Sequence, residues 1–140
     1  MSHWHNPTED RIRELLSKAG SIAVVGCSPK PERTSHQIAA FLIERGYHVI
    51  PVHPGAETIL GQKVYPTLAD IPEAVDIVNV FRKPEFTPPI AADAVAIGAK
   101  ALWLQQGIIN EEAFRIASTG GLICAMDLCI AVMHRMLIRP

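Results

Sequence analysis

Residues 26–35 carry the groups that bind phosphate in proteins. The stretch reads Gly-Cys-Ser-Pro-Lys-Pro-Glu-Arg-Thr-Ser, so one glycine, three hydroxyl side chains and two cations directly follow an apolar run. Amide hydrogens and the positive end of the dipole at a helix start favour an anion, and Lys or Arg adds charge-assisted hydrogen bonds. We expect the stretch to bind a diphosphate, with the candidate residues Gly26, Cys27, Ser28, Lys30, Arg33, Thr34 and Ser35.

A simpler interpretation of the same stretch is structural. Thr34 or Ser35 would only cap the following helix, while Lys30 and Arg33 would be solvated loop residues. The place of the stretch in the fold favours a ligand, because ligands bind at the carboxyl ends of strands in open parallel sheets.

Alternating strands and helices must position this stretch. Apolar, β-branched runs predict five strands, at residues 21–26, 47–52, 75–81, 101–107 and 120–126. Helical spacing of apolar residues predicts the segments between most of them as helices, with Asn110 as a cap and a short leading helix before Gly20. The prediction is one α/β domain over residues 1–140, a Rossmann-like doubly wound parallel sheet with strand order 3-2-1-4-5 along the chain.

The other predicted strand ends add polar and aromatic side chains to the same edge of the sheet. The candidates there are His53, Pro54, Phe81, Arg82 and Lys83. Gln105-Gln106-Gly107 follow the fourth strand, and Asp127 follows the fifth. Four cations and three hydroxyls therefore converge where an open sheet binds its ligand.

Composition excludes several classes of partner. The formal charge is −1, from 13 basic and 14 acidic residues, so no net field attracts nucleic acid or an anionic membrane. Apolar runs such as residues 122–126 are far below the ~18 residues of a membrane span. The three cysteines lie in or beside apolar runs without metal-ligand spacing, as buried thiols of a reducing compartment do. We expect a soluble, cytoplasmic protein with no metal site.

A nicotinamide cofactor fits the sequence poorly. The fingerprint G-x-G-x-x-G needs a second glycine close to the diphosphate, and only Gly26 is present here. The second strand ends in His53-Pro54-Gly55, where an acidic residue would bind the ribose hydroxyls. An NAD(P)-type nucleotide-binding enzyme stays as the alternative class.

Four segments resemble the small stand-alone CoA-binding proteins, which are similar to the nucleotide-binding domain of the succinyl-CoA synthetase alpha subunit. They are "IAVVGCSPKPERTSHQIAAFLIERGYHVIPVHPG", "ILGQKVYPTLADIPEAVDIVNVFRKPE", "ALWLQQGIINEEA" and "MDLC", and the resemblance covers roughly residues 12 to 138. It implies a CoA or acyl-CoA ligand. Many relatives have Asn at His53 and Arg at Leu128, so this chain departs from the family pattern at those two positions.

The resemblance also implies a role for each candidate. Gly26 and Ser28 would line the diphosphate, Lys30 and Arg33 would neutralise it, and Thr34 or Ser35 would donate to it. His53 and Pro54 would contact the adenosine side, and Phe81, Arg82 and Lys83 would flank the adenine and the ribose phosphate. Cys27 is interpreted as a small loop residue; the alternative is a thiol acidified at the helix start that forms a mixed disulfide with CoA.

The function expected from these residues is CoA binding without catalysis, as a carrier, sensor or regulatory module. The resemblance implies that ligation would need a phosphohistidine on a further domain, which we do not expect within residues 1–140, and no paired base and nucleophile stands out here. An enzyme acting on an acyl-CoA and a protein-interaction subunit with a vestigial pocket are the alternatives. The sequence leaves open a homo-oligomer or a protein partner.

Overall fold

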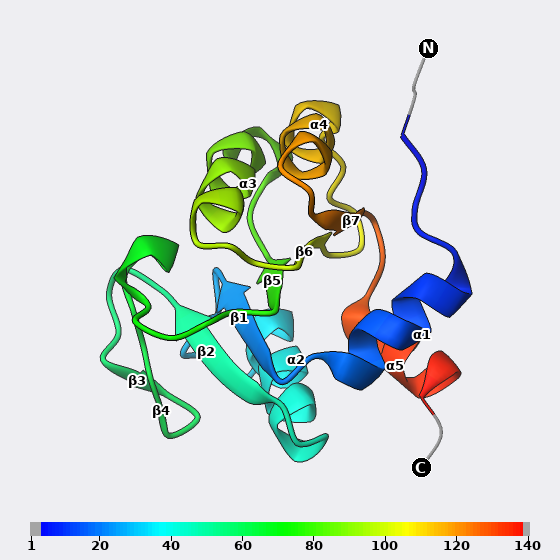
Figure 1. Ribbon diagram of the computed structural model, residues 1–140. Coiled ribbons are helices and arrows are strands. Elements are labelled where there is room, and N and C mark those ends of the chain that lie inside the picture. The colour runs from blue at the N-terminus through cyan, green and yellow to red at the C-terminus, as the bar shows by residue number, and fades with distance from the viewer. Residues whose placement is uncertain (1–3, 139–140) are drawn as a thin grey trace.

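A five-stranded parallel sheet forms the centre of the molecule (Figure 1), seen in a computed structural model that describes residues 4–138. Its strands are β1 (Ser21–Val25), β2 (His48–Val52), β5 (Ile77–Val80), β6 (Ala101–Leu104) and β7 (Ile123–Ala125). The Rossmann-like α/β class predicted from the sequence is confirmed. The ends of the predicted 1–140 domain, residues 1–3 and 139–140, lie outside the described residues.

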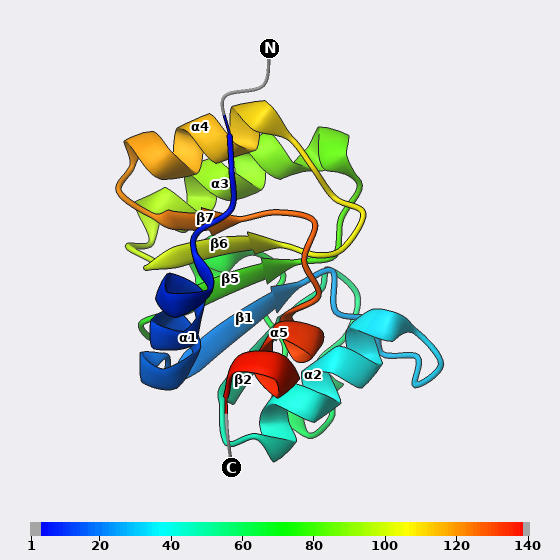
Figure 2. The same cartoon turned by 90° about the vertical axis from the view of Figure 1, so that its right-hand side faces the viewer.

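Helices cover both faces of the sheet (Figure 2). Each face has its own apolar core. One face packs against α1 (Glu9–Lys18), α2 (Thr34–Glu44) and α5 (Ile130–Leu137), and the other against α3 (Thr87–Ala96) and α4 (Glu111–Thr119). Along β1, Ile22 and Val24 enter the first core, whereas Ala23 and Val25 enter the second. Burial on both faces explains why this strand is a continuous apolar run.

The strand order differs from the one expected. The sheet runs β2-β1-β5-β6-β7, which is 2-1-3-4-5 along the chain instead of 3-2-1-4-5. The reason lies in the connection after β2, which contains the hairpin β3 (Thr58–Ile59) and β4 (Gln62–Lys63). Tyr65 then pairs with the free edge of β2: its N–H donates to Pro51 O at 3.1 Å, and its carbonyl accepts from His53 N at 3.0 Å. Because this edge is occupied, β5 pairs with the other side of β1.

Several predicted helix boundaries are confirmed. The Asn110 side chain accepts from Ala113 N at 2.9 Å and caps α4, and Thr8 caps α1 by accepting from Arg11 N. The turn-rich connection before β5 contains the 3-10 helix η1 (Leu68–Asp70). A second 3-10 helix, η2 (Pro84–Phe86), leads into α3, whose first turn holds Pro88 and Pro89.

The N-terminal segment runs past the edge strand β7 (Figure 2). Asn6 Nδ2 donates to Met126 O at 3.0 Å, and Met126 N donates to Asn6 Oδ1 at 2.8 Å. The Trp4 ring packs beside Phe114 on α4, with 6.2 Å between the centroids. This segment therefore pairs with backbone groups just after β7, a strand at the edge of the sheet.

None of the helices within residues 4–138 has both the length and the apolar character needed to cross a membrane.

Candidate functional site

The site begins at Gly26, which directly follows β1. Gly26 has a φ of +82°, a conformation that residues with a Cβ rarely adopt. A Cβ atom there would lie 2.6 Å from the Phe81 carbonyl oxygen and 3.2 Å from Arg82 Cδ. Only glycine therefore allows the loops after β1 and β5 to meet at this point.

The loop from β1 to α2 is held in shape by its own hydroxyl groups. Ser28 N donates to Ser35 Oγ at 2.9 Å, and Lys30 N donates to Ser28 Oγ at 3.1 Å. The carbonyl of Ser28 lies 2.9 Å from His36 Nδ1. These bonds bring the loop back onto the first turn of α2.

The N-terminus of α2 has no side-chain cap. Its N-cap residue is Arg33, which makes no capping hydrogen bond, so the alternative in which Thr34 or Ser35 serves only as the cap is wrong. Ser35 Oγ instead accepts from the loop. The first amide hydrogens of a helix have no partner within the helix, and here they are left for solvent or an anion.

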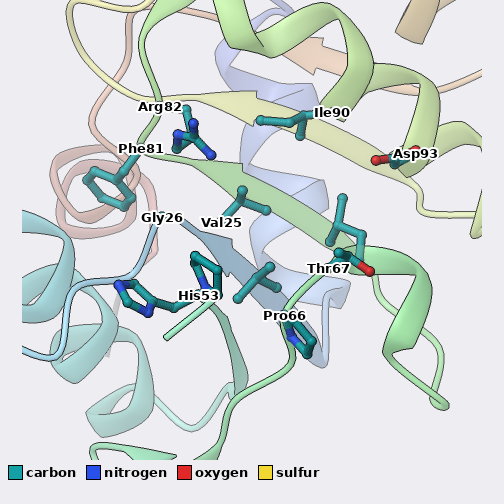
Figure 3. A pocket seen from close by; sticks show the side chains of 12 residues that line it. Val25, Gly26, His53, Pro66, Thr67, Phe81, Arg82, Ile90 and Asp93 are labelled. Atoms are coloured by element: carbon teal, nitrogen blue, oxygen red, sulfur yellow. The ribbon is translucent and has the colours of Figure 1, made fainter. Parts of the chain in front are cut away.

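Two adjoining pockets open at the carboxyl ends of the strands. The first, which we call the α2 pocket, has a volume of about 640 Å³ and is lined by Gly26, Ser28, Glu32, Arg33, Thr34, Ser35, His53 and Phe81. The second, the α3 pocket, measures about 450 Å³ (Figure 3) and is lined by Val25, Gly26, Val52, His53, Pro54, Pro66, Thr67, Leu68, Phe81, Arg82, Ile90 and Asp93. Both include Gly26, His53 and Phe81, so they share a wall.

Each pocket contains one guanidinium and one carboxylate. Arg33 and Glu32 line the α2 pocket, and Arg82 and Asp93 line the α3 pocket. The Arg82 guanidinium lies over the Phe86 ring, 4.8 Å from its centroid, which supports the side chain by a cation–π contact.

His53 lies on the shared wall with a fixed ring. Gly55 N donates to its Nδ1 at 3.0 Å, so a neutral imidazole carries its proton on Nε2. The backbone of His53 is tied to Tyr65 O. The ring is therefore a positioned group between the two pockets (Figure 3).

Nine of the twelve residues predicted for the site line these pockets: Gly26, Ser28, Arg33, Thr34, Ser35, His53, Pro54, Phe81 and Arg82. Lys30 and Lys83 are exposed and line neither pocket, and ligand contacts by their long side chains stay a prediction. The Cys27 side chain is buried under the loop and lines neither pocket. Burial raises the pKa of the Cys27 thiol to about 11, which opposes the acidified thiol considered from the sequence.

The sequence alone did not identify all of the lining. It missed Glu32 within the loop, Val25 and Val52 at the strand ends, Pro66, Thr67 and Leu68 after β4, and Ile90 and Asp93 on α3. Ile90 and Asp93 are three residues apart on one face of α3, and Asp93 is the only charged residue of that helix. This spacing is the sequence feature from which both residues could have been predicted to line the site. Residues 66–68 could not be found, because their place depends on the pairing of Tyr65 with β2.

The other strand-end groups have structural partners. Asp127 Oδ1 accepts from Gly107 N at 2.6 Å, and Gln105 Oε1 accepts from Ile130 N at 3.0 Å. These bonds tie the loop after β6 to the segment between β7 and α5. In the part of the chain that the structure describes, no group of three His, Cys, Asp or Glu side chains could hold a metal ion.

Comparisons with known proteins give one matching family model and several similar chains. A family model described as "CoA binding domain" matches residues 20–135. The chain is 42% identical over 129 residues to the Bacillus subtilis (strain 168) protein YneT, covering 92% of this chain and 96% of YneT. A solved structure from Pyrococcus horikoshii OT3, titled a hypothetical protein, superposes with a TM-score of 0.92 at 38% identity and covers 99% of this chain and 100% of its own.

A third relative is much longer. The ADP-forming acetate–CoA ligase II of Archaeoglobus fulgidus is 30% identical over 94 residues, which make up 66% of this chain and 14% of the ligase. The chain is thus similar to one region of that ligase.

Proposed function

The chain belongs to the CoA binding domain family, and from this premise we propose that it binds CoA or an acyl-CoA across the α2 and α3 pockets without catalysing a reaction of its own. The family resemblance found in the sequence is confirmed. In this role the protein is a carrier, a sensor or a regulatory module. The relative from Archaeoglobus fulgidus, an acetate–CoA ligase, supports a CoA ligand.

The observation that carries the proposal is the pair of pockets, each lined by one arginine, that meet at Gly26. In the α2 pocket, Arg33 and the uncapped amides of the first turn of α2 suit a diphosphate. In the α3 pocket, apolar walls suit an adenine ring, and Arg82 suits the 3′-phosphate on the ribose. CoA is a nucleotide that needs both a diphosphate site and a further phosphate site.

An NAD(P)-type enzyme is the weaker candidate. The loop after β1 has one glycine, and Ser28 and Pro29 stand where the nicotinamide fingerprint brings bare backbone to the diphosphate. His53, at the end of β2, offers no carboxylate to the ribose hydroxyls.

Binding without turnover is proposed from the groups that line the pockets. Thioester chemistry needs a nucleophile or activated water, a base and donors for the oxyanion. The Cys27 thiol is buried with a raised pKa, and Ser35 Oγ is engaged in holding the loop. The imidazole of His53 accepts from Gly55 N at Nδ1 and carries its proton on Nε2, so neither ring nitrogen has a free lone pair with which to act as a base in this geometry.

Native mass spectrometry of the purified protein, followed by release and identification of bound small molecules, tests the ligand. The expected species is a complex with CoA or an acyl-CoA at a ratio of one per chain. A nicotinamide dinucleotide in its place, or failure to take up added CoA, would contradict the proposal.

A thiol-release assay with acetyl-CoA and succinyl-CoA tests the absence of catalysis. We expect release at the buffer rate. Steady release that disappears in His53→Ala, while CoA affinity is kept, would show that the protein is an enzyme.

A further inference from the structure

The α3 pocket has two ends of opposite charge. Arg82 follows β5 and lies beside Gly26 and Phe81, whereas Asp93 projects from α3 at the far side of Ile90 (Figure 3). Among the residues that the structure describes, neither side chain takes part in a salt bridge. The Asp93 carboxylate also has no hydrogen bond within the described chain, so its acceptor atoms are free for a ligand.

A carboxylate accepts hydrogen bonds and repels phosphate. A nucleotide placed in this pocket therefore has its phosphates near Arg82 and the α2 pocket, and a neutral donor near Asp93. The donors of the CoA nucleotide are the 6-amino group of adenine and the ribose 2′-hydroxyl. The ribose carries the 3′-phosphate, which draws it toward the cationic end.

The walls next to Asp93 suit a base more than a sugar. Pro54, Pro66, Leu68 and Ile90 contribute apolar surface to the pocket, and Ile90 lies between the two charged ends (Figure 3). A flat aromatic ring loses contact with water against such walls, which is the main source of favourable free energy in apolar pockets. A donor on the edge of that ring then meets the carboxylate.

We propose that Asp93 is a specificity-determining residue that accepts a hydrogen bond from the 6-amino group of the adenine of CoA. This inference rests on the proposed function and goes further, because it selects the base. Guanine has a carbonyl oxygen at the corresponding position, and two acceptors facing each other disfavour binding. The protein therefore discriminates for adenine nucleotides at the α3 end of its groove.

The test compares CoA with 1,N6-ethenoadenine-CoA, in which the 6-amino donor is blocked, by titration calorimetry on the full chain. Asp93→Ala should lower the affinity for CoA about tenfold, a typical loss for a hydrogen bond to a charged group. It should change the affinity for etheno-CoA by less than about twofold. Asp93→Asn should stay within about threefold of the wild type for CoA, because its amide oxygen still accepts.

Glu85→Ala is the matched control. Glu85 is an exposed carboxylate on η2 that lines neither pocket, so its removal changes the charge nearby and should leave both affinities unchanged. The ligand-free melting temperature of Asp93→Ala should equal that of the wild type, since Asp93 is exposed and unpaired within the described chain.

Three results would overturn the role of Asp93, and the third would also overturn the proposed function. Equal losses for CoA and etheno-CoA in Asp93→Ala would put the contact on the ribose, and no loss for either would remove Asp93 from the site. Both leave CoA binding itself intact. A wild-type chain that binds neither ligand would overturn the proposed function together with this inference.

Discussion

The carbonyl oxygen of Phe81 occupies the space that a side chain at Gly26 would need, since a Cβ atom there would lie 2.6 Å away. This contact joins the loops after β1 and β5. Both loops line the two pockets, so the shape of the whole groove depends on one close approach between backbones.

Gly26→Ala should therefore both destabilise the protein and lower its affinity for CoA. The φ of +82° costs about 1–2 kcal/mol for a residue with a Cβ, and the overlap with Phe81 adds about 1–3 kcal/mol. Gly46→Ala is the control, because Gly46 has a φ of +94° and nothing within 4 Å of its Cβ position. Urea unfolding measures both, and equal losses would show that the Phe81 contact is unimportant.

Arg33 and Lys30 should differ in their effect on CoA, although the sequence assigns both to the diphosphate. Arg33 lines the α2 pocket and Lys30 does not. Arg33→Ala should lower the affinity for CoA about tenfold or more, as expected for the loss of a charge-assisted hydrogen bond. Lys30→Ala should lower it by less than about threefold.

Pantetheine, which has no phosphate, is the control ligand for this pair and should bind equally to both variants and the wild type. Calorimetric titration measures the affinities. An equal loss of CoA affinity in Lys30→Ala would mean that the loop closes over the ligand.

The three cysteines should react unequally with a thiol reagent under native conditions. Burial raises the pKa of Cys27 to about 11 and that of Cys124 to about 12, whereas Cys129 is partly exposed. Near neutral pH we expect one fast thiol, lost in Cys129→Ser. A fast reaction that is lost instead in Cys27→Ser would restore the reactive thiol considered from the sequence.

His134 should make stability depend on pH. It lies in the interface of α2 and α5, edge-on to Phe41 and Tyr47, and burial and then the charge of Arg45 lower its pKa below the ordinary 6.5. Arg135 also lies over the Phe41 ring, so the surrounding charges are positive.

The unfolded chain binds this proton more readily than the folded one. The neutral His134 ring therefore makes its whole contribution to the free energy of unfolding above about pH 6.5, and this contribution is lost as the pH falls below that value. Urea unfolding at a series of pH values should show a decline that is smaller in His134→Phe. An identical decline in this variant would assign the pH dependence to other groups.

The sequence predicted the fold class because its strands are buried runs of β-branched residues and its helices have clear starts, such as Asn110. It could not predict the strand order, since two hydrogen bonds of Tyr65 decide which edge of the sheet remains open. At the site, residue type was enough to find Arg33 and Arg82. Asp93 was missed because its role depends on how α3 stands over the sheet, and the burial of Cys27 because it depends on the path of one loop.

Titration calorimetry of the wild-type chain with CoA and with NAD tests the central claim most directly. The account predicts one CoA site per chain, no measurable binding of NAD at the same concentrations, and a loss of about tenfold or more in either Arg33→Ala or Arg82→Ala. Equal binding of NAD and CoA, or CoA binding that neither substitution changes, would contradict a CoA site in the groove at Gly26.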